Sequence, residues 1–137
     1  MREVLWVSIG ALAGANLRFL VSRVAVRLTV SHPLQFPWPV LFINVTGSFI
    51  LGYFMMWSTQ RLAIADSTVT TVSNIPSLIL LIAIGFCGSY TTFSTFAYES
   101  LQLFQQGHIA AFAANLLANN LLCILGVLAG ASLAKAL

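Results

Sequence analysis

Charged residues are scarce in this chain of 137 residues: they make up 7% of it, as six Lys or Arg and three Asp or Glu. A soluble domain carries roughly a quarter charged residues, so this composition excludes an ordinary soluble fold. The net charge of +3 comes without a basic stripe, so nucleic acid is not an expected partner. With 59% hydrophobic residues and a mean hydropathy of +0.95, the chain has the composition of a membrane protein.

Cysteine and histidine are also few, with two of each. Cys87 and Cys123 fall in apolar segments, where cysteine usually acts as a small packing residue, so no disulfide or metal framework is expected. His32 and His108 lie in predicted loops. No nucleophile stands with a plausible base, which argues against an enzyme.

Four apolar segments are long enough to cross a lipid bilayer, because about 20 apolar residues span its hydrocarbon core. The predicted spans are 4–25, 40–57, 75–104 and 109–133. Arg2 before an apolar run resembles a signal peptide, but the run is too long for one and predicts a retained helix. The spans predict a single all-α membrane domain over residues 1–137.

The third predicted span is too long for one simple crossing and contains residues 88–91 (GSYT). We predict that its helix breaks there and resumes at Thr92. Hydrocarbon offers no water to backbone groups, so a break survives only where protein or a wet cavity supplies partners. The carbonyl-rich end of one half-helix attracts cations, and the N-terminus of the next attracts anions. The segment therefore predicts an ion-handling feature at membrane depth.

Two phenylalanines and two hydroxyls follow this predicted break. Phe93 and Phe96 are three residues apart, with Ser94 and Thr95 between them. Most phenylalanine pairs at this spacing are packing residues, but the edge of an aromatic ring is positive, so two rings can also hold a small anion. Glu99 has three interpretations: a buried proton carrier, an acceptor for hydroxyls, or an interfacial charge.

Each remaining span carries polar residues with two interpretations. Arg18 in the first span either snorkels to the interface or lines a vestibule that attracts anions. Asn44 in the second span faces the same way as Ser48, and either bonds a neighbouring helix or offers N–H donors to an anion. Asn115 and Asn119 in the fourth span either line a polar track or join helices.

Lys and Arg are divided almost evenly between the two sides of a four-span topology. One side receives Arg2, Arg61 and Lys135, and the other Arg23 and Arg27. Because Lys and Arg counts set orientation, a chain with so little bias is able to insert both ways round, and two inverted copies would form an antiparallel dimer.

Small residues recur four apart, as close packing of membrane helices requires. They are Gly10 and Gly14, Ser48 and Gly52, and Gly126 and Gly130. Packing within one chain explains any single pair. Four short helices hardly enclose a polar pathway alone, however, so several tight faces favour an oligomer.

Three blocks of sequence together resemble the Fluc-type fluoride channels, the CrcB-like family. They are residues 10–19 (GALAGANLRF), residues 44–49 (NVTGSF), and residues 85–88 (GFCG) followed by 91–96 (TTFSTF). The blocks occur in the right order on the right spans, and the resemblance covers essentially the whole chain.

The resemblance implies a dual-topology, antiparallel homodimer in the lipid bilayer of the cell membrane, in bacteria the inner membrane. It implies two narrow pathways through which fluoride leaves the cytoplasm passively. It also implies a structural sodium ion at the centre of the dimer, bound by backbone carbonyls of both subunits. By position, Gly88 and Thr91 would supply these carbonyls.

The resemblance also assigns residues to the fluoride pathway. By position they are Arg18, Asn44, Phe93, Ser94, Thr95, Phe96 and Glu99. The chain departs from the family pattern at Ser89, where glycine is common, and in the fourth span. There Asn115 and Asn119 replace the tyrosine and serine that often line the pathway, so these two are added to the predicted pathway.

The prediction is a passive fluoride-selective channel. Fluoride is strongly hydrated, so a pore must replace its water with amide, hydroxyl and ring-edge contacts that still let it leave. The main alternative is a small multidrug or cation exporter, for which Glu99 is the only acidic candidate inside a span. A membrane scaffold without transport is the third interpretation, and it makes no use of a broken helix.

Overall fold

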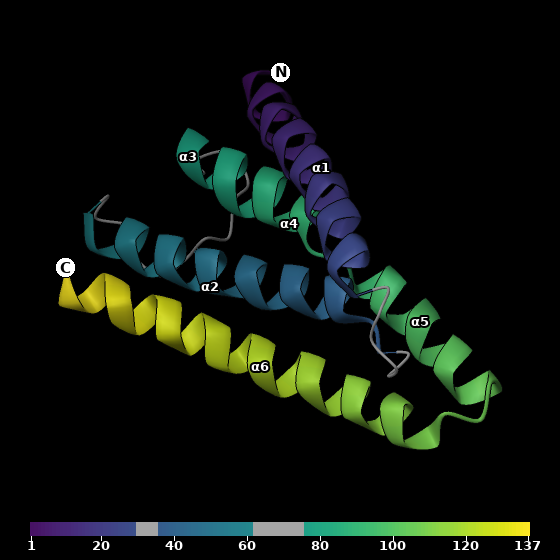
Figure 1. Ribbon diagram of the computed structural model, residues 1–137. Helices are drawn as coiled ribbons and strands as arrows, with labels where there is room; N and C mark the ends of the chain where they lie inside the picture. The colour runs from purple at the N-terminus through teal and green to yellow at the C-terminus, as the bar shows by residue number, and fades with distance from the viewer. Residues whose placement is uncertain (30–35, 62–75) are drawn as a thin grey trace.

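The computed structural model describes residues 1–29, 36–61 and 76–137, and the regular structure within them is helical (Figure 1). The long helices are α1 (Arg2–Thr29), α2 (Trp38–Arg61) and α6 (Ile109–Ala136). Between α2 and α6 the chain forms α3 (Ser77–Ile79), the π-helical segment η2 (Leu80–Cys87), α4 (Gly88–Tyr90) and α5 (Phe93–Gln105). These elements make four segments long and apolar enough to cross a membrane, which confirms the predicted number of spans.

The observed helices are somewhat longer than the predicted spans. The first ends at Thr29 where residue 25 is predicted, and the second at Arg61 where residue 57 is predicted. Helical hydrogen bonding continues through polar residues beyond an apolar run, so hydropathy alone underestimates helix length. His32 lies outside the described residues.

Helices α2 and α6 lie side by side and run in the same direction (Figure 1). Glycines allow their backbones to approach closely: a Cβ added at Gly52 would lie 2.8 Å from the Cα of Val127. A Cβ at Gly130 would lie 2.7 Å from the backbone nitrogen of Tyr53. Lipid gives helices no hydrophobic reason to associate, so such close packing stabilises the pair.

Helix α1 packs in the same way against η2 (Figure 1). A Cβ at Gly85 would lie 2.6 Å from the carbonyl oxygen of Val7, and one at Gly10 would lie 2.8 Å from the nitrogen of Phe86. The predicted small-residue faces are therefore helix contacts within one chain.

Ser89 adds a polar contact to this pair. Its hydroxyl lies 3.0 Å from the carbonyl oxygen of Ala11 on α1 and 3.2 Å from that of Phe86. The side chain thus ties α4 to α1.

The turn between α5 and α6 is tight and contains His108, as predicted for a loop residue. Gly107 has a φ of 77°, a conformation that a glycine adopts without steric cost. The N–H of His108 donates to the carbonyl of Leu103 over 2.9 Å, which closes the end of α5.

Two residues between α4 and α5, the 91–92 junction, have extended backbone. Thr91 has φ −78° and ψ 161°, and Thr92 has φ −152° and ψ 109°. The helical backbone continues through Tyr90, so the non-helical part is shorter and later than the predicted 88–91. The Thr92 hydroxyl caps α5 by accepting the N–H of Thr95 over 3.2 Å.

Candidate functional site

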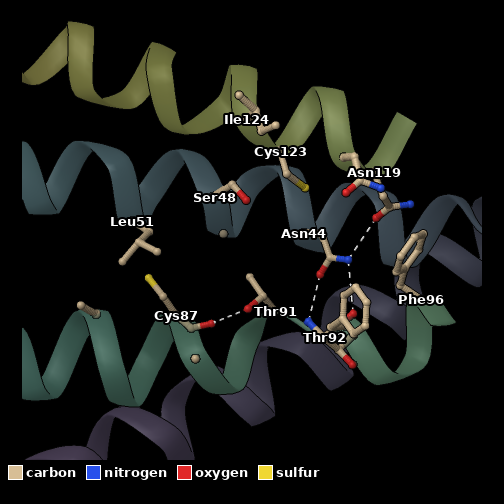
Figure 2. Close-up of a pocket in the computed structure, with 15 residues that line it drawn as sticks. Asn44, Ser48, Leu51, Cys87, Thr91, Thr92, Phe96, Asn119, Cys123 and Ile124 are labelled. Atoms are coloured by element: carbon tan, nitrogen blue, oxygen red, sulfur yellow. Dashed lines mark hydrogen bonds between the residues drawn. The ribbon is translucent and has the colours of Figure 1, made fainter. Parts of the chain in front are cut away.

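A cavity of about 380 Å³ lies between α2, α6 and the segments around the 91–92 junction (Figure 2). Its polar lining comes from three parts of the chain that are far apart in sequence. The polar lining residues are Asn44, Ser48, Thr91, Thr92, Asn119 and Asn120, and the aromatic ones are Phe93 and Phe96.

Asn44 holds the 91–92 junction in place. Its Oδ1 accepts the backbone N–H of Thr92 over 2.9 Å, and its Nδ2 lies 3.3 Å from the carbonyl oxygen of the same residue (Figure 2). One buried amide therefore pairs with both backbone polar groups of Thr92, which the departure from the helix leaves without their usual partners. This contact is what allows non-helical backbone beside apolar helices.

A continuous chain of hydrogen bonds extends from Asn44 along α6. Asn44 Nδ2 donates to Asn119 Oδ1 over 3.0 Å, and Asn119 Nδ2 donates to Asn115 Oδ1 over 2.8 Å. Asn115 Nδ2 then donates to the hydroxyl of Ser100 on α5 over 2.9 Å. We call this set with Thr92 the asparagine network. It joins α2, α5, α6 and the junction. In these contacts the amides join helices, which is one of the two interpretations offered by the sequence.

The two predicted pore phenylalanines are in ring contact but differ in environment. Their ring centroids are 5.5 Å apart and their planes are tilted by 59°. Phe96 is 5% exposed, whereas Phe93 is 77% exposed. A phenylalanine with so much of its ring outside the chain needs lipid or protein to cover it.

Ser94 and Thr95 lie on the exposed side of α5 and are not among the residues that line the cavity. The Thr92 hydroxyl lies 2.9 Å from that of Thr95 and 3.3 Å from that of Ser94. These hydroxyls therefore cap the start of α5 together.

The carbonyls of Gly88 and Thr91 lose their usual helical donors. In a continuous helix the N–H groups of Thr92 and Thr95 would bond to them. Here the Thr92 N–H donates to Asn44 and the Thr95 N–H to the Thr92 hydroxyl. Both carbonyl-bearing residues line the cavity, and unwound backbone carbonyls are ligands that suit Na⁺. These two backbone carbonyls therefore fit the sodium ion that the resemblance implies.

Glu99 and Arg18 lie apart from this cavity. Glu99 lines a second cavity of about 220 Å³ with Phe36, Gln102 and Gln106, and its buried Oε2 has no hydrogen-bond partner among the described residues. Arg18 is half-buried on α1 and is not among the lining residues of either cavity. Of the predicted pathway residues, the first cavity is lined by Asn44, Phe93, Phe96 and Asn119 and the second by Glu99, whereas Arg18, Ser94, Thr95 and Asn115 are among the lining residues of neither.

Two members of the asparagine network, Thr92 and Ser100, are missing from the predicted site. A hydroxyl in an apolar span usually bonds to its own helix, so its sequence signal is weak. Cys87 and Cys123 are free cysteines that line the first cavity. In the described ranges no group of His, Cys, Asp and Glu has the arrangement of a metal site.

Four membrane-length helices around an amide-lined cavity define a multi-pass membrane protein. The arrangement is of the kind that ion-handling proteins use, with irregular backbone only where it lines a cavity. Residues 5–131 match the family model described as CrcB-like protein, Camphor Resistance (CrcB). The chain belongs to this family.

Curated relatives carry the name fluoride-specific ion channel FluC. The one from Koribacter versatilis (strain Ellin345) is 46% identical over 137 residues, which cover 100% of this chain and 98% of that protein. The one from Methylococcus capsulatus (strain ATCC 33009 / NCIMB 11132 / Bath) is 39% identical over 96% of this chain and 52% of that protein. The one from Methanococcus aeolicus (strain ATCC BAA-1280 / DSM 17508 / OCM 812 / Nankai-3) is 36% identical over 95% of this chain and 93% of that protein.

The family is a class of ion channels and not of enzymes. Together with the four apolar helices, it makes this chain a multi-pass membrane protein, as fits the bacterial inner membrane.

Proposed function

We propose that this chain is a single four-helix domain that forms a fluoride-selective channel and lets fluoride leave the cytoplasm passively. The observation that carries the proposal is the 91–92 junction, held by Asn44 beside a polar cavity between membrane-length helices. A full-length relative named for fluoride conduction supports the choice of ion.

The cavity wall is suited to passage of an anion. Among the described residues that line it, none is Lys, Arg, Asp or Glu. Hydroxyl and amide donors and positive ring edges would replace the water around fluoride, while the absence of fixed charge in this wall would let the ion leave. Conduction needs binding that is adequate and not deep.

We further propose that two copies assemble antiparallel, with two pathways per dimer. Support comes from the near-even division of Lys and Arg between the two sides and from the 77% exposure of Phe93. A second copy would cover this ring and close the cavity against lipid.

A structural sodium ion at the centre of such a dimer is part of the proposal. Gly88 and Thr91 of both copies would hold it through the carbonyls that have lost their helical donors. When bound, the ion would supply a fixed positive charge between the two copies.

The first test is fluoride efflux from liposomes that hold the purified protein, measured with a fluoride electrode. Valinomycin carries potassium out to balance the charge, and chloride is followed in parallel. We expect rapid fluoride loss with chloride retained. Absence of fluoride flux through folded, dimeric protein would refute the proposal.

Phe96→Ile should lower fluoride flux at least tenfold, because the aliphatic side chain keeps the packing and loses the positive ring edge. Phe104→Ile is the matched control. Phe104 lies on α5, as Phe96 does, but is not a lining residue of the cavity. Its ring centroid is 5.5 Å from that of Phe112, with the same 59° tilt between the ring planes. Equal flux in the two variants would remove Phe96 from the pathway. If Phe96→Ile kept full transport and Glu99→Gln abolished it, the cation-exporter alternative would be favoured.

Added lysines next to Arg61 should force one orientation and silence the protein. Thr59→Lys combined with Gln60→Lys uses two exposed positions at the end of α2. Flux should return when this variant is mixed with one biased the other way by Leu28→Lys, also an exposed position. Orientation is measured by labelling of terminal tags from outside the vesicle, and full activity of a singly oriented variant would refute the antiparallel dimer.

A further inference from the structure

Most hydrogen-bond donors around the main cavity are already used within the protein. Both N–H groups of Asn44 are directed to protein oxygens, and so are both of Asn119. The Thr91 hydroxyl donates to the carbonyl of Cys87 over 2.9 Å, and the Thr92 hydroxyl donates to the hydroxyl oxygen of Thr95 over 2.9 Å. An anion would have to break these bonds to use these donors, which costs free energy.

Ser48 is an exception on its own helix. The other Ser and Thr hydroxyls of α2, those of Thr46, Ser58 and Thr59, donate to carbonyls three or four residues earlier, at 2.7, 2.9 and 2.8 Å. The Ser48 hydroxyl has no hydrogen-bond partner among the described residues, although it is half-buried. It lines the cavity and points from α2 toward the segment that carries Cys87 (Figure 2).

Asn120 is the second side chain with an unused donor. One N–H of its exposed amide donates to the carbonyl of Leu116 over 2.7 Å, which leaves the other. Asn120, Cys123 and Ile124 follow one another at three- and four-residue spacing on α6 and line the cavity together. These residues extend along α6 from the unused N–H of Asn120 toward the part of α6 that lies beside Ser48.

We propose that the Ser48 hydroxyl forms a further anion subsite in the cavity, about 6 Å along α2 from Asn44. The unused N–H of Asn120 is the donor that the anion meets before it reaches Ser48. This inference rests on the proposed function. The ligand is a small, strongly hydrated anion such as fluoride, because a hydroxyl bonded to an anion makes a strong, charge-assisted hydrogen bond. Asn44 and Asn119 then act as positioning residues that keep the wall in shape.

The test compares fluoride flux against fluoride concentration for the wild type, Ser48→Ala, Ser48→Thr and Asn120→Leu in liposomes. Ser48→Ala should raise the half-saturating concentration about tenfold or more, the usual effect of losing a hydrogen bond to a charged group. Ser48→Thr keeps the hydroxyl and should restore the wild-type value, and Asn120→Leu should slow flux. Thr59→Ala is the control, since its hydroxyl bonds to its own helix and it lies outside the cavity lining.

A binding measurement separates this inference from the proposed function. Fluorine NMR of the purified protein should show fluoride binding that Ser48→Ala weakens and Thr59→Ala does not. A wild type that conducts, with Ser48→Ala unchanged in half-saturation and binding, overturns the subsite and leaves the channel standing. A wild type without flux refutes the channel, and binding that is equal in both variants then overturns the subsite as well.

Discussion

Gly10→Ala is expected to lower the unfolding temperature of the protein strongly. The new Cβ would lie against the carbonyl oxygen of Leu81 and 2.8 Å from the nitrogen of Phe86. Both are backbone atoms, so no side-chain rotation relieves the clash, and α1 must move away from η2. Overpacking of this kind costs about 1–3 kcal/mol, and a clash with backbone atoms belongs at the upper end, a large part of the roughly 5–15 kcal/mol that stabilises a typical domain. The measurement is thermal unfolding in detergent, with size-exclusion chromatography.

Gly88→Ala is the matched control for this prediction. A Cβ at Gly88 meets only the carbonyl oxygen of Ala83, at 4.0 Å, so the space is open. The backbone carbonyl proposed as a sodium ligand is retained. We expect Gly88→Ala to lower the unfolding temperature much less than Gly10→Ala does, and equal unfolding temperatures in the two variants would contradict the packing of α1 on η2.

Asn44→Ala is expected to eliminate fluoride flux, with a smaller loss of stability. The substitution leaves the N–H of Thr92 and the Oδ1 of Asn119 without their partner. Each buried group left unpaired costs about 1–3 kcal/mol, and the 91–92 junction loses the amide that fixes its backbone. We expect at least a hundredfold lower flux in liposomes, together with a lower unfolding temperature.

Asn16→Ala tests whether this effect is specific. Asn16 is exposed on α1, and its amide donates only to the carbonyl of Leu12 on its own helix, over 2.7 Å. The Asn16→Ala substitution removes the same chemical group from a membrane helix. It should leave fluoride flux within about twofold of the wild type and the unfolding temperature unchanged. Flux in Asn44→Ala equal to that in Asn16→Ala would show that conduction does not depend on the contact between Asn44 and the 91–92 junction.

The four helices are predictable from sequence because hydrocarbon thickness sets the length of an apolar run. Their ends are less predictable, since α1 and α2 continue through arginines that hydropathy places outside the span. The position of the junction follows from Thr92, whose backbone bonds to Asn44 on a helix 48 residues away. No local pattern contains that contact, so the sequence predicts a departure from helix near 88–91 but not its location at 91–92.

The sequence predicts which polar residues belong to the site better than it predicts which of them bond to each other. Asn44, Asn115 and Asn119 stand out because amides are rare in apolar spans, yet the order in which they bond depends on how α2 and α6 are aligned. That alignment comes from backbone contact at glycines such as Gly52 and Gly126. Ser48 is prominent in sequence because it lies four residues after Asn44, whereas its unused hydroxyl becomes apparent only when the partners of the other hydroxyls on α2 are known.

The closest backbone approaches divide the chain into two stiff bodies. Gly52, Gly126 and Gly130 fasten α2 to α6, and Gly10 and Gly85 fasten α1 to η2. Neither pair is able to slide internally without backbone collisions, so we expect any rearrangement of the helices to move one pair relative to the other. The asparagine network connects the α2–α6 pair to the 91–92 junction with short, directional bonds. The protein is thus built as two closely packed helix pairs joined by side-chain hydrogen bonds, and a movement of one pair against the other would change these bonds without requiring a helix to bend.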